Sequence, residues 1–192
     1  MKKYLVLLAA VFLAGCSSAS SEVVPDETAV PSAVTESAAA EPSASSVPEL
    51  HLSSQDLSDG VWNSVIASEG SGQNLSPELS FDAVEGAEEY AVVMIDPDAN
   101  NWLHWIASGI TTTELSEGSN PGSYKGPYPP SGTHTYEVTV YALKAAPDVL
   151  PGTFDAAGNS PEDLFAGMDT AGGSRGNVIV SETISGTYTA GN

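Results

Sequence analysis

The sequence YAVVMIDPDANNWLHWIASGI (residues 90–110), followed by GSYKGPYPPSGTHTYEVTVYAL (residues 122–143), decides the fold of this chain. Its first six residues are a continuous apolar run, which is typical of a strand covered on both faces. Pro97 ends this run because proline has no N–H to donate to a neighbouring strand. A second apolar run begins at Leu103, and residues 133–143 alternate between polar and apolar positions. The stretch therefore predicts three strands of a mainly β fold.

The same stretch gathers polar side chains, since it holds two of the three histidines and two of the three tryptophans. If the second strand is regular, His104 shares a face with Trp102 and Ile106. The opposite face would then carry Leu103, Trp105 and Ala107. In the strand over residues 133–143, one face carries His134, Tyr136, Val138, Val140 and Ala142. Both histidines have apolar neighbours, which fits either core histidines or a binding site.

Residues 49–192 have the length of one ordinary domain. Residues 49–53 (ELHLS) alternate and predict a short edge strand that carries His51. Residues 56–68 predict a turn followed by a short strand or a single helical turn. Ser160, Pro161 and the acidic residues after them predict the start of a short helix that ends near Met168. The β-branched residues of 177–189 predict a last strand.

The first 16 residues have the features of an export leader. Lys2 and Lys3 precede an apolar run over residues 4–13, which is too short to span a bilayer, and small residues lead to Cys16. The sequence LAGC (residues 13–16) matches the lipobox of bacterial lipoproteins, which implies cleavage before Cys16 and acylation of its thiol. The alternative is a lone buried cysteine. We expect residues 1–15 to be a signal peptide and Cys16 to anchor the protein to a bacterial membrane, outside the cytoplasm.

The segment after Cys16 differs in composition from the rest of the chain. Up to residue 48 it contains no aromatic residue, lysine or arginine, and most of it is Ala, Ser and Pro. Such a segment buries too little apolar surface to offset its ordering entropy, so residues 16–48 are predicted to be a disordered tether. The formal charge of the chain is −20, which argues against nucleic acid as a partner.

Five blocks of the domain resemble the signature blocks of the phosphatidylethanolamine-binding protein family, and most of all its bacterial, Raf-kinase-inhibitor-like branch. The blocks are NLSPELSF (74–81), DPDA (96–99), LHW (103–105), YKGPYPP (124–130) and HTY with YAL (134–136 and 141–143). They follow the family's order, and the resemblance spans residues 52–188. One such block is a weak signal, whereas five in order are specific.

The resemblance implies a β-sandwich, with a large antiparallel sheet, a smaller sheet and one or two short helices. It also implies a small pocket that takes phosphate, phosphorylethanolamine or a similar group. Carried over by position, the ligand-binding residues are Asp96, Asp98, His104, Gly126, Pro130, His134 and Tyr136, and Gly126 would supply a backbone amide. Imidazole N–H groups can donate to phosphoryl oxygens, and a carboxylate can fix the tautomer of an imidazole. For the two aspartates the alternative is a turn held by Asx-type hydrogen bonds.

Two positions depart from the family's pattern. The family usually has proline after the DPDA block, where this chain has Asn100, so the rim of the pocket is expected to be looser. The bacterial branch often has a histidine before the last strand, where this chain has Asn177. We expect both changes to affect the occupancy and the ligand preference of the pocket.

These observations predict an envelope lipoprotein that binds a small phosphoryl or anionic ligand, needs no cofactor and catalyses no reaction. One alternative is a protein-interaction module, similar to protease or kinase inhibitors, that engages an envelope protein. Another is a phosphoesterase or metal-assisted hydrolase built on the same histidines and aspartates, although no closely spaced histidine pair marks a metal site. GGSRG (172–176) matches G-x-S-x-G, but a nucleophile elbow needs a strand before the serine and a helix after it, the reverse of the predicted order.

Overall fold

A computed structural model describes residues 48–191 of the chain. The predictions for the leader, for Cys16 and for nearly all of the tether lie outside the described residues. Within residues 48–191, no helix is both long and apolar enough to cross a membrane.

The domain is built on one seven-stranded sheet with the strand order β1-β2-β11-β8-β4-β5-β7. Its strands are β1 (Leu57–Ser58), β2 (Val61–Trp62), β4 (Glu89–Asp96), β5 (Trp102–Ile110), β7 (Ser123–Tyr124), β8 (Thr133–Leu143) and β11 (Val178–Thr189). Two small sheets pair β3 (Leu79–Ser80) with β6 (Glu114–Leu115), and β9 (Thr170–Ala171) with β10 (Ser174–Arg175). The helical segments are η1 (Ser64–Ile66), η2 (Pro97–Ala99) and α1 (Pro161–Met168).

The large sheet is antiparallel apart from one contact. β8 lies between β4 and β11 and pairs with both in antiparallel register. β2 meets β11 in parallel, at the single pair Val61 and Thr187. The mainly β fold, with a large sheet, smaller sheets and short helices, confirms the prediction.

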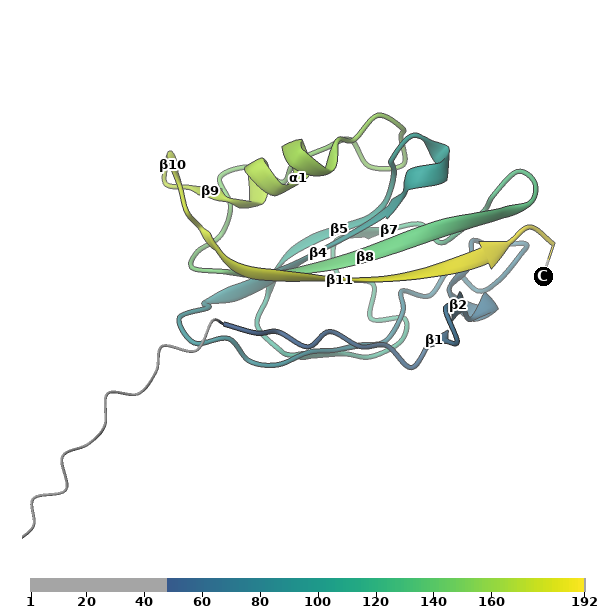
Figure 1. Cartoon of the computed structure of the whole chain (residues 1–192), viewed down its shortest axis with the longest axis horizontal. Helices are drawn as coiled ribbons and strands as arrows, with labels where there is room; N and C mark the ends of the chain where they lie inside the picture. Colours follow the sequence, from purple (N-terminus) through teal and green to yellow (C-terminus); the bar gives the residue numbers. More distant parts are fainter. Residues whose placement is uncertain (1–47, 192) are drawn as a thin grey trace, which may run out of the picture. The chain divides into compact units, whose positions relative to one another are not determined.

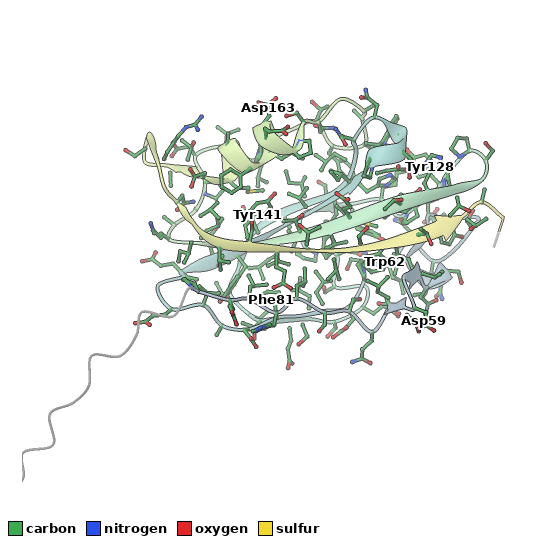
Figure 2. The ribbon with its side chains drawn as sticks, viewed as in Figure 1. Asp59, Trp62, Phe81, Tyr128, Tyr141 and Asp163 are labelled. Carbon is green, nitrogen blue, oxygen red and sulfur yellow. The ribbon has the colours of Figure 1, made fainter. Side chains whose placement is uncertain are left out.

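Both faces of the large sheet are covered, which explains the continuous apolar run of β4. On one face, Val92 and Met94 pack in a cluster with Leu50 and Leu52 and with residues of β3 and β6. On the other, Val93 packs in a cluster with Leu164 and Met168 of α1. Figure 1 shows α1 on one side of the long strands β4, β8 and β11, and the segment that carries the short edge strands β1 and β2 on the other side. Trp62 and Phe81, labelled in Figure 2, lie on the side away from α1.

The helix α1 begins and ends as its sequence predicts. The side chain of Ser160 caps it by accepting a hydrogen bond from the N–H of Asp163 (3.1 Å), and Pro161 occupies the first turn. Its last helical residue is Met168, whose buried side chain faces the sheet.

The predicted edge strand over residues 49–53 is wrong. His51 has a φ of 46°, in the left-handed region, which breaks the extended chain, and only Ser53 forms a bridge, with Ser80. The exposed imidazole of His51 instead lies beside two carboxylates, with Nδ1 2.6 Å from Asp82 and Nε2 3.2 Å from Glu49.

Candidate functional site

A pocket of about 580 Å³ lies at the end of the large sheet where β4 turns through η2 into β5. We call it the histidine pocket; its lining residues are Asp96, Asp98, Ala99, Trp102, His104, Tyr128, Pro129, Pro130 and His134. Tyr128, at this end of the sheet, is labelled in Figure 2. Five of the seven predicted ligand-binding residues therefore meet in one pocket wall, and their use by a ligand remains a prediction.

Asp96 connects the turn after β4 with His134, near the start of β8. It is 2 % exposed; its Oδ1 accepts from the N–H of Ala99 (2.9 Å), and its Oδ2 lies 2.7 Å from Nδ1 of His134. The carboxylate thus holds the η2 turn and orients an imidazole of the pocket at the same time. The turn role considered for Asp96 is present, and its use by a ligand remains a prediction.

His104 enters the pocket because β5 is not a regular strand. Met94 pairs with Trp105 but Ile95 pairs with Leu103, so His104 is the extra residue of a bulge. The bulge turns Leu103 to the face that packs against α1, while Trp105 packs on the other face. The prediction that Leu103 and Trp105 share a face is therefore wrong, because it assumes a regular strand.

The imidazole of His104 is only 3 % exposed. Its Nδ1 lies 2.8 Å from the carbonyl oxygen of Lys125, which can only accept, so Nδ1 is the donor. Burial lowers the pKa of His104, and the Lys125 carbonyl and the nearby carboxylates of Asp96 and Asp155 offset only part of this effect. Near neutral pH the ring is therefore uncharged.

Tyr136 lies behind the two histidines and does not line the pocket. Its ring contacts that of His104 edge-on, with centroids 5.3 Å apart, and stacks near that of His134, at 6.5 Å. The side chain is fully buried, and within residues 48–191 its hydroxyl has no hydrogen-bond partner. Burial, and next the charge of Asp96, raise the pKa of this hydroxyl, so it remains a protonated donor.

Asp98 lines the pocket but uses one carboxylate oxygen to hold the fold. Its Oδ2 accepts from the backbone N–H of Thr135 at 2.7 Å, which joins η2 to β8. This bond lowers the pKa of Asp98, so the carboxylate is charged near neutral pH. The Asx turn considered for Asp98 is replaced by this contact between two elements.

The expectation that Gly126 supplies a backbone amide to the ligand is wrong. Its N–H donates to Oδ1 of Asn74 at 2.8 Å, and Gly126 is not among the lining residues. A side chain at this position would collide with the backbone, because a Cβ would lie 1.9 Å from the carbonyl oxygen of Ile66. Glycine is therefore required here by close packing against η1.

The aromatic part of the wall, Trp102 and Tyr128, is not among the predicted ligand-binding residues. Trp102 and Tyr128 meet edge-on with centroids 6.2 Å apart, and Asp155 holds both, by accepting from Trp102 Nε1 (3.1 Å) and from the Tyr128 hydroxyl (2.8 Å). Lys125 Nζ lies 3.2 Å from Asp155. Burial would raise the pKa of Asp155, but these three donors together lower it. Trp102 adjoins the LHW block and Tyr128 lies inside the YKGPYPP block, whereas no sequence signal marks Asp155.

The two departures from the family's pattern have separate structural roles. Asn100 has φ 53° and ψ 50°, a left-handed conformation that proline cannot adopt, and its carbonyl oxygen accepts from the N–H of Gly158 (2.7 Å). This bond attaches the rim to the loop before α1. Asn177 is buried and bonds to Ala145 and Met168. Asn177 does not line the histidine pocket. Among the described residues, therefore, no direct contact supports the expected effect of Asn177 on that pocket.

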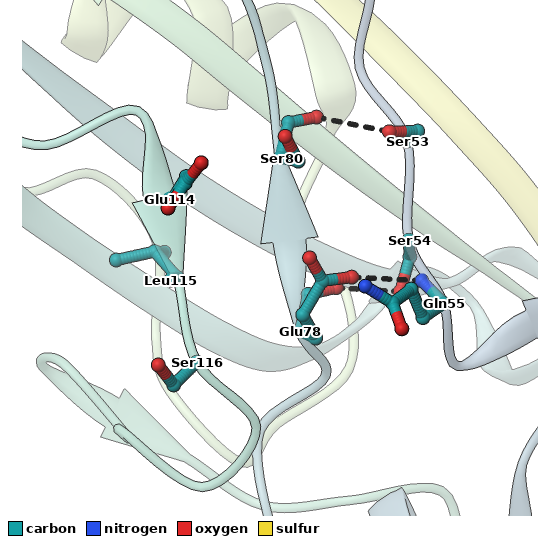
Figure 3. A pocket seen from close by; sticks show the side chains of 8 residues that line it. All are labelled: Ser53, Ser54, Gln55, Glu78, Ser80, Glu114, Leu115 and Ser116. Atoms are coloured by element: carbon teal, nitrogen blue, oxygen red, sulfur yellow. Dashed lines mark hydrogen bonds between the residues drawn. The ribbon is translucent and has the colours of Figure 1, made fainter.

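Other hollows lie outside this pocket. One of about 490 Å³ is lined by four serines, by Gln55, Glu78 and Glu114, and by Leu115; Figure 3 shows Glu78 at its centre. A smaller one, of about 230 Å³, includes Lys144 and Arg175. Ser174 of GGSRG lies on β10, which follows α1 and precedes β11, so it is not in a nucleophile elbow. Among residues 48–191, no three His, Cys, Asp or Glu side chains are grouped as metal ligands.

Comparison with known proteins identifies the family of this chain. The family model of phosphatidylethanolamine-binding proteins matches residues 21–189. A UPF0098 protein of Methanothermobacter thermautotrophicus is 33% identical over 142 residues, covering 62% of this chain and 86% of the relative. LppC of Mycobacterium tuberculosis, whose name designates a lipoprotein, is 33% identical over 166 residues, covering 74% of this chain and 78% of its own.

Two solved structures have the same fold. CT736 of Chlamydia trachomatis, described as a homolog of phosphatidylethanolamine-binding protein, matches with a TM-score of 0.56 and 28% identity, over 72% of this chain and 96% of that one. YbcL of E. coli, described as a new member of the mammalian family, matches with a TM-score of 0.55 and 25% identity, over 73% of this chain and 98% of that one. This chain therefore belongs to the phosphatidylethanolamine-binding protein family.

Proposed function

We propose that this protein is an envelope lipoprotein that binds a small phosphoryl ligand in the histidine pocket and catalyses no reaction on it. The observation that carries the proposal is the convergence of His104 and His134 on one pocket, each with its Nδ1 atom fixed by an acceptor. Such fixed rings are preorganised, so little side-chain entropy is lost when a ligand binds.

The chemistry of the wall fits a phosphoryl group with an organic substituent. The Nε2 atoms of the two histidines can donate to phosphoryl oxygens when protonated. The carboxylates of Asp96 and Asp98 and the rings of Trp102 and Tyr128 can accommodate an ammonium group, as in phosphorylethanolamine.

The leader and a relative support attachment to a membrane. The LAGC sequence at residues 13–16 places Cys16 where lipoproteins are acylated, and LppC, which matches over most of this chain, has the name of a lipoprotein. In this proposal the lipid on Cys16 holds the protein at the membrane, and residues up to 48 serve as the tether.

Calorimetric titration of the full-length protein with phosphorylethanolamine and with inorganic phosphate tests ligand binding. We expect saturable binding by the wild type. Loss of a hydrogen bond to a charged group costs about 1.5–3 kcal/mol, so His104→Ala should weaken binding by about tenfold or more. His51→Ala is the matched control, because His51 lies outside the pocket and should leave binding unchanged. No binding by the wild type at millimolar ligand would refute the proposal.

A protein-interaction role is the second candidate, and exposed apolar side chains favour it. Val149, Leu150, Phe154 and Phe165, in the loop before α1 and on α1, are between 37% and 73% exposed. Capture of an envelope protein that Phe154→Ser and Phe165→Ser abolish, and that His134→Ala leaves intact, would support this role. Capture that depends on His134 alone would oppose it.

Turnover is the third possibility and is tested separately. If the pocket only binds, a panel of phosphoesters should remain unhydrolysed by the wild type. Hydrolysis that His104→Ala abolishes would contradict the non-catalytic proposal.

A further inference from the structure

The donors around the histidine pocket are largely used within the protein. Trp102 Nε1 and the Tyr128 hydroxyl both donate to Asp155, and the N–H of Ala99 donates to Asp96. The two prolines of the wall have no N–H. A phosphoryl oxygen can only accept hydrogen bonds, so the wall offers it few partners as it stands.

The pocket also lacks a lysine or arginine to attract an anion. No lysine or arginine is among its lining residues, while the carboxylates of Asp96 and Asp98 are. Lys125 lies close in the fold, but its Nζ is paired with Asp155 at 3.2 Å. The chain as a whole carries a formal charge of −20. Entry of a dianion therefore requires a compensating positive charge.

The hydrogen bonds of the two imidazoles determine which ring nitrogens remain for a ligand. Nδ1 of His104 faces the Lys125 carbonyl, and Nδ1 of His134 faces the Asp96 carboxylate, so both Nδ1 atoms must donate. In an uncharged ring with this tautomer, Nε2 is an acceptor. Within residues 48–191, the bonds to Lys125 and Asp96 use Nδ1 of each ring and leave Nε2 for a ligand, and an unprotonated Nε2 cannot bind a phosphoryl oxygen.

This inference rests on the proposed function and concerns the protonation of the pocket when the ligand binds. We propose that a phosphoryl dianion binds together with one proton from the solvent, which Nε2 of His104 takes up. The added proton changes Nε2 from an acceptor into a donor and gives the ring a positive charge. No covalent bond to the ligand forms or breaks.

The dianion changes the protonation state of His104. Burial lowers its pKa, so the ligand-free ring is neutral near pH 7, and a dianion beside it compensates for the lost hydration of the charged form. The charged and titratable groups that face it from the surrounding elements are Asp96, Asp155, His134, Tyr128 and Tyr136. The two tyrosines stay protonated because burial raises their pKa. The carboxylates then favour the protonated ring.

Sulfate is the decisive probe, because it is a dianion without a titratable proton near neutral pH. Calorimetry of the full-length protein with sulfate, in two buffers of different ionisation enthalpy, counts the protons taken up. We expect uptake of about one proton at about pH 7 and a dissociation constant that rises about tenfold per pH unit above neutrality. With inorganic phosphate, the same uptake is expected where phosphate is a dianion.

The variant His104→Gln separates proton uptake from binding. The glutamine amide is a donor at every pH but carries no positive charge, so sulfate should bind more weakly than to the wild type, with a flat pH profile and no proton uptake. As a second measurement that needs no variant, the ¹⁵N signal of His104 Nε2 in the wild type should change from an unprotonated to a protonated value when sulfate saturates the pocket at about pH 7.

Three results would overturn the inference, and they can be told apart from failure of the proposed function. Anion binding by the wild type without proton uptake contradicts this inference alone. So does an Nε2 signal that stays unprotonated in the saturated complex, or proton uptake that persists in His104→Gln. If no anion or phosphorylethanolamine binds even at about pH 5.5, where histidine is readily protonated, the proposed function fails as well.

Discussion

The Nδ1 atom of His134 lies 2.7 Å from Oδ2 of Asp96, although 38 residues separate them in the chain. Asp96 ends β4 and His134 is near the start of β8, so antiparallel pairing of these strands brings the two side chains to the same end of the sheet. The other oxygen of Asp96 holds the η2 turn. One buried carboxylate thus contributes both to stability and to the orientation of a pocket histidine.

Asp96→Asn should lower the stability of the fold and the affinity for phosphorylethanolamine. An asparagine has one oxygen for the two N–H groups that Asp96 now accepts, and its amide would present a donor to one of them. We expect a loss of about 1–3 kcal/mol in the free energy of unfolding, measured with urea. Asp98→Asn, at an exposed position, is the control and should cost less. Equal losses in both variants would contradict this role of Asp96.

Tyr136→Phe should weaken neither the fold nor ligand binding. Within residues 48–191 the buried hydroxyl of Tyr136 has no partner, so its removal should leave the free energy of unfolding unchanged or raise it by about 1 kcal/mol. Affinity for inorganic phosphate should stay the same, because this hydroxyl does not line the pocket. Tyr128→Phe is the matched control: it removes a bond to Asp155 and should lower stability. A large loss of stability in Tyr136→Phe would show that its hydroxyl supports the fold.

The stability of the ligand-free protein should depend on pH through His104. Burial lowers its pKa in the folded state, so the unfolded chain takes up the proton first as the pH falls. The contribution of His104 is complete above its unfolded pKa of about 6.5 and is lost as the pH falls toward its folded pKa. Urea unfolding at several values between about pH 5 and pH 7 should show this loss in the wild type and not in His104→Gln.

His51 provides a control with the opposite sign. Its hydrogen bond to Asp82 raises its pKa, so its contribution is present below about pH 6.5 and is lost as the pH rises through its folded pKa. In His51→Gln, the loss of stability above about pH 6.5 should disappear, and the loss from His104 below that value should remain. The carboxylates of Asp98 and Asp155, whose pKa values are lowered, lose their contributions only below about pH 4 and do not interfere.

Gly126→Ala should destabilise the protein by more than about 2 kcal/mol, because its Cβ would lie 1.9 Å from a backbone oxygen of η1. Gly132→Asn is the control: Gly132 has φ 71° with open space around it, and asparagine tolerates this conformation. It should cost less than about 1 kcal/mol. Thermal unfolding compares the two variants, and a mild effect of Gly126→Ala would mean that the backbone of η1 can move.

Alternation and turn residues were sufficient to predict the framework. The alternation from Thr133 to Leu143 matches the bounds of β8, and it also gives the face that carries His134. The Ser160–Pro161 start of α1 was recognised for a similar reason, because capping depends on neighbouring residues alone. Features set by local chemistry were therefore accessible from the sequence.

Features set by contacts between distant segments were not accessible. The bulge at His104 depends on how β5 pairs with β4, and regular alternation gives the wrong face for Leu103. Likewise, the amide of Gly126 is used by Asn74, 52 residues earlier, and Asp155 reaches Trp102 from a loop 53 residues later. No pattern along the chain reports such bonds, because each forms only after the sheet has brought its partners together.

The most direct test of a phosphoryl-binding histidine pocket is to follow amide and imidazole NMR signals of the full-length protein during titration with phosphorylethanolamine at about pH 6. The account predicts saturable changes concentrated at His104, His134, Ala99 and the Trp102 indole, with little change at Lys144 and Arg175 in the separate basic hollow. Absence of any change, or changes confined to Lys144 and Arg175, would contradict it.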